Sequence, residues 1–251
     1  MNIIVCAKQV VDVSEIKIDS DNKPRITGIP KKISDFDKNA LEEALKIKEK
    51  NGGTITILTV GTADAKEKIK ELLAMGADKA VLVTTDHPDQ STTPHLLKAA
   101  IEHIGEYDLI ICGEASIDQF SGQTGPYLAG LLNISQLTYA IKTEATEQHI
   151  ICHRDLGDET LIEQSSYPTL ITVTKEINQP RLPNIMAIMA SANKPIEEIQ
   201  AEELKADVCG TLSQTDLSGV KAQRKNIVYQ DDIENAVETI VEELDKQGVF
   251  S

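Results

Sequence analysis

The residues best suited to bind a ligand lie in a short polar stretch, GEASIDQFSGQTGPYLAGLL, at residues 113–132. An apolar run ending at Cys112 precedes it and predicts a buried strand, and the leucines at its end predict a helix. Between the two stand small and polar residues, among them Gly122, Gln123 and Thr124. In a parallel sheet, such a loop lies at the carboxyl edge, where helix N-termini offer free N–H groups to phosphate. The pattern suits nucleotide binding but is weak by itself, because it is neither a GxGxxG nor a Walker motif.

Individual residues of this loop suit the parts of a nucleotide. Gly113 would turn the backbone off the strand, and Gly122 and Gly125 would let a ligand approach closely because they lack a Cβ. Asp118 can accept a hydrogen bond from a ribose hydroxyl or from a backbone N–H. A structural turn stabilised by Asp118 and Thr124 is the other interpretation, and the residues alone leave both open.

The elements that must position this loop alternate along the chain. Strand-like runs occupy residues 3–7, 54–60, 80–84 and 109–112, helical patterns occupy 37–50, 63–75 and 94–104, and 23–29 could form a hairpin arm. Strands separated by helices of this length predict right-handed crossovers and a parallel sheet covered on both faces. The fold class is therefore expected to be α/β, a three-layer Rossmann-like adenine-nucleotide-binding domain.

After residue 138 the rhythm changes to short strand-like runs without helices, which predicts an antiparallel extension of the sheet. These runs are residues 139–143, 149–153, 160–163 and 169–173. We expect residues 1–190 to form one α/β domain and 191–251 to form an extended C-terminal arm. Residues 190–228 are polar and irregular, whereas 231–247 carry apolar residues at helical spacing. That terminal helix either packs on its own domain or reaches a partner subunit.

Composition excludes several classes of protein. The 251 residues carry a net charge of −15, which argues against a nucleic-acid or anionic-membrane surface. No apolar run approaches the ~20 residues of a membrane span, and the N-terminus lacks the features of a signal peptide. Cys6, Cys112, Cys152 and Cys209 are scattered and form no metal or disulfide pattern. We therefore expect a cytoplasmic protein without a metal site or membrane insertion.

Other reactive side chains have ordinary interpretations. Cys6 and Cys112 suit small core positions at strand ends better than redox groups, and a site contact by Cys6 would use its backbone. The histidines form no ligand spacing, and Glu42 and Glu43 are expected to lie on a solvated helix edge. No Ser/His/Asp or Cys/His set indicates nucleophilic catalysis, so we expect no chemical step by protein side chains.

Five segments together resemble the β subunit of the electron transfer flavoproteins, the family that includes the FixA proteins of nitrogen fixation. They occur in family order and are VCAKQVVD (5–12), SDFDKNALEEALKIKE (34–49), LLAMGADKAVLV (72–83), GEASIDQFSGQTGP (113–126) and KEINQPRLPNIM (175–186). The resemblance implies a heterodimer with an α subunit that holds most of the FAD site. It implies that the β subunit binds AMP, or a second FAD in electron-bifurcating members.

The resemblance also implies a function. The heterodimer would collect electrons from dehydrogenases and deliver them to a membrane quinone oxidoreductase or another acceptor, with the flavin supplying the redox chemistry. The implied nucleotide contacts fall on Cys6, Ser34, Asp35, Phe36, Asp37, Val60, Gly113, Ser116, Ile117, Asp118, Gly122, Gln123 and Thr124. The implied partner-docking segment carries Leu182 as its anchor, with Ile185 and Met186 beside it; these residues could instead cover the sheet edge.

The sequence departs from the family pattern at a few positions. Ser34-Asp35 stands where Asn-Pro is usual, Glu114 replaces a cation, with a side chain that could face solvent, and the docking segment is short. The Gln-Thr-Gly sequence at 123–125 favours AMP, whereas Gly125-Pro126 also resembles the bifurcating type.

Two other classes of protein remain as alternatives. A stand-alone adenine-nucleotide-binding module of the universal-stress-protein type would not need the arm or the docking segment. An ATP-cleaving enzyme of the related hydrolase-like fold would need a serine- and glycine-rich loop after the first strand, and KQVVD at residues 8–12 does not supply one.

Overall fold

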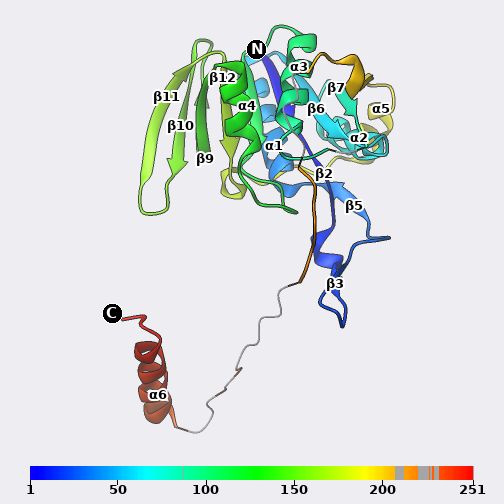
Figure 1. Ribbon diagram of the computed structural model, residues 1–251. Coiled ribbons are helices and arrows are strands. Elements are labelled where there is room, and N and C mark those ends of the chain that lie inside the picture. Colours follow the sequence, from blue (N-terminus) through cyan, green and yellow to red (C-terminus); the bar gives the residue numbers. More distant parts are fainter. Residues whose placement is uncertain (87, 207–211, 220–225, 227, 229–231, 251) are drawn as a thin grey trace.

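A computed structural model describes residues 1–86, 88–206, 212–219, 226, 228 and 232–250. Cys209 and residue 231, the first of the helical pattern 231–247, lie outside the described residues. A nine-stranded sheet in the order β11-β10-β9-β12-β8-β1-β6-β7-β13 forms its centre (Figure 1). These strands are β1 (Asn2–Cys6), β6 (Thr54–Gly61), β7 (Lys79–Thr84), β8 (Leu109–Gly113), β9 (Ser135–Ala145), β10 (His149–Asp155), β11 (Thr160–Ser166), β12 (Thr169–Val173) and β13 (Ile196–Gln200). Neighbours from β9 to β13 are parallel, which confirms the predicted α/β class.

Helices cover both faces of the sheet (Figure 1). The covering helices are α1 (Asp35–Asn51), α2 (Ala65–Met75), α3 (Thr93–Ile104) and α4 (Thr124–Leu132). The chain also forms α5 (Ile185–Ser191), which packs beside α2, and α6 (Ile233–Lys246). Side chains alternate along β1, so Ile3 and Val5 pack in the core with α1 and α2, whereas Ile4 and Cys6 pack with α3 and α4. The two apolar layers place the N-termini of α1, α3 and α4 at the carboxyl edge of the sheet.

Smaller elements extend from the N-terminal half. Strands β2 (Gln9–Val11) and β5 (Lys31–Ile33) pair with each other, and β3 (Lys17–Ile18) pairs with β4 (Pro24–Arg25). The latter pair is the hairpin arm expected around residues 23–29. Short 3₁₀ turns lie at Val13–Glu15, Lys175–Ile177 and Ala201–Glu203.

The prediction of an antiparallel extension is only partly correct. Strands β10 and β11 are antiparallel to their neighbours, but β12 returns into the sheet between β9 and β8 and is parallel to both. All five residues of β12 are buried, as is typical of a central strand covered on both faces. An apolar run of this length does not reveal its partners, and so the pattern could not give the strand order.

The stretch 190–228 is not irregular throughout its described part. Residues Ile196–Gln200 form β13, which pairs with β7 in parallel at the sheet edge. Its exposed Glu197 and Glu198 hide the apolar alternation that marks a strand, as is common for edge strands. The division between domain and arm after residue 190 remains a prediction, and β13 beyond it belongs to the sheet.

Helix α6 confirms the terminal amphipathic helix. Asp232 caps it by accepting a hydrogen bond from the N–H of Asn235. Its apolar residues Ile233, Val237, Ile240 and Val241 are exposed, and Figure 1 shows α6 apart from the α/β body. The described part of the body leaves these side chains exposed, and contact of α6 with a partner subunit stays a prediction. No helix in the described part of the chain is both long and apolar enough to cross a membrane.

Candidate ligand-binding site

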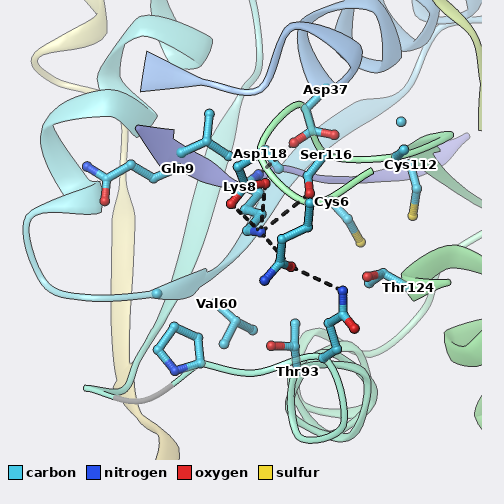
Figure 2. A pocket seen from close by; sticks show the side chains of 18 of the residues that line it. Cys6, Lys8, Gln9, Asp37, Val60, Thr93, Cys112, Ser116, Asp118 and Thr124 are labelled. Atoms are coloured by element: carbon cyan, nitrogen blue, oxygen red, sulfur yellow. Dashed lines mark hydrogen bonds and ion pairs between the residues drawn. The ribbon is translucent and has the colours of Figure 1, made fainter. Parts of the chain in front are cut away.

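A cavity of about 380 Å³ opens at the carboxyl edge of the sheet, between the ends of β1, β6 and β8 and the N-termini of α3 and α4 (Figure 2). This is the edge where ligands bind in open parallel sheets. Nine of the thirteen residues expected to contact a nucleotide line the cavity. They are Cys6, Asp37, Val60, Gly113, Ser116, Asp118, Gly122, Gln123 and Thr124.

The other four expected residues do not line the cavity. Ser34 is fully buried and its Oγ accepts a hydrogen bond from the Ile117 N–H at 3.3 Å. Asp35 forms an ion pair with Lys32 at 3.3 Å. Phe36 packs edge-on against Phe120, with 5.7 Å between ring centroids. Ser34, Ile117 and Phe36 thus hold the loop 113–124 against the start of α1, and their role here is to position the loop.

Asp37 is a buried carboxyl group at the cavity wall. Its Oδ2 accepts a hydrogen bond from the Lys8 N–H at 2.7 Å. Burial raises the pKa of Asp37 to about 7, against the opposing effect of backbone N–H donors from Lys8 and Gly113. Asp37 therefore changes its charge near neutral pH.

Two glycines permit close contacts that any side chain would prevent. A Cβ at Gly113 would lie 2.6 Å from the Phe36 Cβ and 2.7 Å from the Asp37 Oδ1, so the close approach of α1 to β8 at this point requires glycine. A Cβ at Gly125 would lie 2.7 Å from the Thr172 Cγ2. Gly125 lines the cavity, but its missing side chain is required by the packing of α4 on β12. Gly122 has φ +64°, a left-handed conformation that favours glycine.

Lys8 is a cavity residue that the sequence interpretation missed. Its Nζ lies 2.8 and 3.0 Å from the carboxylate oxygens of Asp118, 3.4 Å from the Ser116 Oγ and 3.2 Å from the Gln119 Oε1 (Figure 2). Its position two residues after the first strand could have indicated it, because residues following parallel strands gather at one edge.

The start of α3 and the segment before it contribute a further part of the wall that was not expected. Asp89, Gln90 and Thr93 line the cavity, and the Gln90 Nε2 donates to the Gln119 Oε1 at 3.3 Å. Glu114 also lines the cavity and is half-buried, rather than facing solvent as expected. Burial is the main cause that raises its pKa, followed by the charges of Glu176 and Asp155.

The two cysteines at the cavity floor are buried, as expected for small core residues. Cys6 ends β1 and Cys112 lies on the adjacent β8. A hydrogen bond with Cys6, and then burial, raises the pKa of the Cys112 thiol well above its usual range, so this thiol is a poor nucleophile. Among the described residues, no group of three His, Cys, Asp or Glu side chains could hold a metal ion.

Comparison with known proteins identifies the family. The family model for the electron transfer flavoprotein domain matches residues 25–204. The chain is 36% identical to the electron transfer flavoprotein subunit beta of Thermoanaerobacterium thermosaccharolyticum, with all of both chains covered. It is 36% identical to the Caffeyl-CoA reductase-Etf complex subunit CarD of Acetobacterium woodii (84% and 83% covered) and 31% identical to protein FixA of Sinorhizobium fredii (97% and 92%). This chain belongs to the electron transfer flavoprotein β-subunit family.

Membership gives the general role. Electron transfer flavoprotein β subunits are parts of electron carriers rather than classical enzymes, and the family implies an α-subunit partner. The resemblance inferred from the five sequence segments is thereby confirmed.

The docking segment expected in such a β subunit is exposed on this chain. The side chains of Leu182, Ile185 and Met186 are 92%, 77% and 79% exposed. The alternative that they cover the sheet edge is therefore wrong. Ile188 and Met189 of α5 are also exposed and continue the apolar surface.

Buried acidic residues hold this segment, contrary to the expectation of a solvated helix edge. Glu42 and Glu43 are only 4% and 6% exposed. The Glu42 carboxylate accepts hydrogen bonds from the Arg181 guanidinium at 2.8 and 3.0 Å and from its backbone N–H at 3.0 Å. Glu43 accepts from the Asn178 Nδ2 at 3.0 Å. Helical periodicity predicted exposed carboxylates because it considers only neighbouring residues. The partners that allow these carboxylates to be buried lie about 140 positions away in the sequence.

Proposed function

We propose that this chain is the β subunit of a heterodimeric electron transfer flavoprotein and binds AMP in the cavity at the carboxyl edge of its sheet. The α subunit would hold most of the FAD site, and the flavin would carry the electrons when bound. The observation that carries the proposal is the cavity lined by the family loop 113–124. AMP would then be a structural ligand, because the described residues that line the cavity include no Ser/His/Asp or Cys/His set.

The helix start at Thr124 suits the phosphate of the nucleotide. The N–H groups of Thr124 and Gly125 fall in the first turn of α4, where intrahelical acceptors are missing. Pro126 has no N–H, and the N–H of Tyr127 already bonds to the Gln123 carbonyl. A phosphate at this point would meet two backbone donors, the Thr124 hydroxyl and the positive end of the helix dipole.

The size of the cavity favours AMP over a second FAD. A volume of about 380 Å³ is at the low end for ligand pockets, which suits a mononucleotide better than a dinucleotide. A second FAD, as in electron-bifurcating members, is the competing proposal because Gly125-Pro126 resembles that type. Mass spectrometry of the compounds released from the denatured heterodimer distinguishes the two. We expect AMP in a 1:1 ratio to the heterodimer and one FAD.

Co-purification tests the heterodimer itself. We expect the chain, co-expressed with its α subunit, to purify as a yellow complex. A colourless homodimer that contains an adenine nucleotide would favour the stand-alone module instead. A well-folded yellow heterodimer without any adenine nucleotide beyond its FAD would contradict the proposed role of the cavity.

We further propose that the segment from Leu182 to Met189 docks electron-donating dehydrogenases, and that a quinone oxidoreductase or another acceptor receives the electrons. Pro180 and Pro183 stiffen the segment and lower the entropy lost on binding. The exposed Leu182 side chain is suited to enter a partner pocket, because exposed apolar anchors of this kind dominate many interfaces.

Leu182→Ala tests this docking role. Since Leu182 packs against little of its own chain, we expect unchanged melting temperature and flavin content. Electron uptake from the dehydrogenase should show a KM raised about ten- to hundred-fold, with kcat recovered at high concentration. Ile162→Ala removes an equally apolar exposed side chain from β11 and serves as the control. Unchanged kinetics in both variants would contradict the docking role of Leu182.

A further inference from the structure

We infer that Lys8 recognises the phosphate of the bound nucleotide by leaving Asp118, so that the Asp118 carboxylate competes with the ligand for the Lys8 ammonium. This inference rests on the proposed nucleotide site and adds the residue pair that would set its preference for a phosphorylated ligand. It applies to AMP and equally to the phosphates of a dinucleotide.

The Lys8 ammonium is held by one loop and faces the cavity. Its hydrogen-bond partners Ser116, Asp118 and Gln119 are all residues of the loop that follows β8. The side chains of Lys8 and Asp118 are 38% and 23% exposed, so water reaches the pair and the two groups can separate at modest cost. Figure 2 shows the Lys8 ammonium and the Thr124 hydroxyl projecting into the same cavity.

The charges around the cavity single out Lys8. Among the described residues, the acidic residues of its wall are Asp37, Asp89, Glu114 and Asp118, and the basic residues are Lys8 and Lys31. A phosphate anion entering a wall with this excess of carboxyl groups needs a nearby cation.

Lys31 is already engaged outside the loop. Its Nζ lies 2.8 Å from the Asp64 carboxylate, and hydrogen bonds, chiefly from Lys31, lower the pKa of Asp64 to about 2. Lys31 thus pairs with a residue that lies outside the loop 113–124. Among the described residues of the wall, Lys8 is thus the cation whose side chain is hydrogen-bonded to the loop that carries the expected phosphate position.

If Asp118 and the phosphate compete for Lys8, substitutions at Lys8 and at Asp118 should change the AMP affinity in opposite directions. Removing the Lys8 charge removes a charge-assisted bond to phosphate, whereas removing the Asp118 charge frees Lys8 for the phosphate. A purely structural latch predicts the same sign for both, because either change would loosen the loop 113–124. The signs of the two effects therefore separate the interpretations.

The experiment is calorimetric titration of the α/β heterodimer, freed of endogenous adenine nucleotide, with AMP and with adenosine. In Lys8→Met we expect AMP affinity to fall about ten- to hundred-fold, with adenosine affinity unchanged. In Asp118→Asn we expect AMP affinity to rise about two- to fivefold. Lys32→Met, which removes a cation outside the cavity wall that pairs with Asp35, controls for the loss of charge and should leave both affinities unchanged.

Two results would overturn the inference while leaving the proposed function intact. One is an equal loss of AMP and adenosine affinity in Lys8→Met. The other is weaker AMP binding in Asp118→Asn, and both would make the pair a loop latch. Failure of the unmodified heterodimer to bind either compound would instead remove the proposed function, and the inference with it.

Discussion

At the scale of single residues, Asp37 is a buried, ionisable carboxyl group at the cavity wall. Its environment is made by the backbone N–H of Lys8 and by the close approach of Gly113. The same carboxyl on a helix surface would have its ordinary pKa, so the fold, and not the residue type, gives Asp37 a charge change near pH 7.

Asp37→Asn should change the pH dependence of stability. Asp37 has a pKa of about 7 in the folded chain against 3.8 for the ordinary group. The protonated Asp37 therefore stabilises the folded chain. This contribution is fully present below pH 3.8 and is lost as the pH rises through about 7. Between pH 5 and 8 the free energy of unfolding of the wild type should therefore fall relative to that of the variant, by up to about 3 kcal/mol.

Denaturant unfolding at several pH values measures this difference. Asp158→Asn, in the exposed turn between β10 and β11, controls for the loss of one carboxylate. Parallel pH profiles for wild type and Asp37→Asn would show that Asp37 does not retain a proton near neutral pH.

Gly113→Ala should destabilise the chain by about 1–3 kcal/mol, because the new Cβ would overlap with Phe36 and Asp37. Gly130→Ala is the matched control. Gly130 lies inside α4 with no atom within 4 Å of the new Cβ, so this change should stabilise by about 0.5–1 kcal/mol. Thermal unfolding of both variants tests the pair, and a Gly113→Ala variant as stable as wild type would argue against the tight crossing of α1 over β8.

At the scale of elements, α1 connects two functional regions. Its first turn carries Asp37 at the cavity, and its middle carries Glu42 and Glu43, which hold the segment that leads to Leu182. Asn39, between them, donates to the Asn178 carbonyl at 2.8 Å. One rigid helix therefore supports both the candidate nucleotide site and the proposed docking segment.

Arg181→Met should disturb both stability and docking. The change leaves the buried Glu42 carboxylate without its guanidinium partner, at a cost of about 1–3 kcal/mol, since Arg181 itself is partly exposed. Because Leu182 follows directly, we expect KM for the dehydrogenase to rise as well.

The double variant Glu42→Met, Arg181→Met separates the two effects. The double variant should regain much of the lost free energy of unfolding, because it leaves no buried charge without a partner. If the ion pair positions Leu182, KM for the dehydrogenase should remain raised. Glu49→Gln, which affects only the exposed arm of the cluster, should change the free energy of unfolding by less than about 1 kcal/mol. A double variant with wild-type KM would show that the ion pair contributes to stability only.

At the scale of the whole molecule, the chain combines a well-packed α/β body with an arm whose helix is amphipathic but uncovered. Fourteen residues form a marginal helix in water on their own. The exposed apolar stripe of α6 indicates an interface, and we propose that the α subunit covers it.

Removing the arm after residue 206 should therefore weaken the heterodimer without unfolding the body, which keeps β13. We expect the melting temperature of the isolated chain to change little and the dissociation constant for the α subunit to rise at least tenfold. Val241→Asp should reproduce this loss within the full-length chain, whereas Glu238→Gln, on the polar face, should not. Equal affinities in sedimentation experiments would show that α6 does not contribute to this interface.

The sequence by itself determined the strands and helices of the first half of the α/β core and the position of the loop. Apolar periodicity in β1, β6, β7 and β8, with the glycine-rich loop after β8, is a property of neighbouring residues and can be recognised locally. Because all parallel strands end at one edge, it also follows from the sequence that residues such as Cys6, Val60 and Thr124 meet there.

Only the tertiary structure decided which segments come together within that frame. The insertion of β12 between β9 and β8, the burial of Glu42 by Arg181 and the pairing of Lys8 with Asp118 join positions that are far apart in the chain. Local patterns carry no record of such partners, because a charged or apolar residue has the same identity whether it is covered or not. The burial of a residue depends on what the completed fold packs against it. The pKa of Asp37 and the availability of Lys8 for a ligand therefore depend on the tertiary structure.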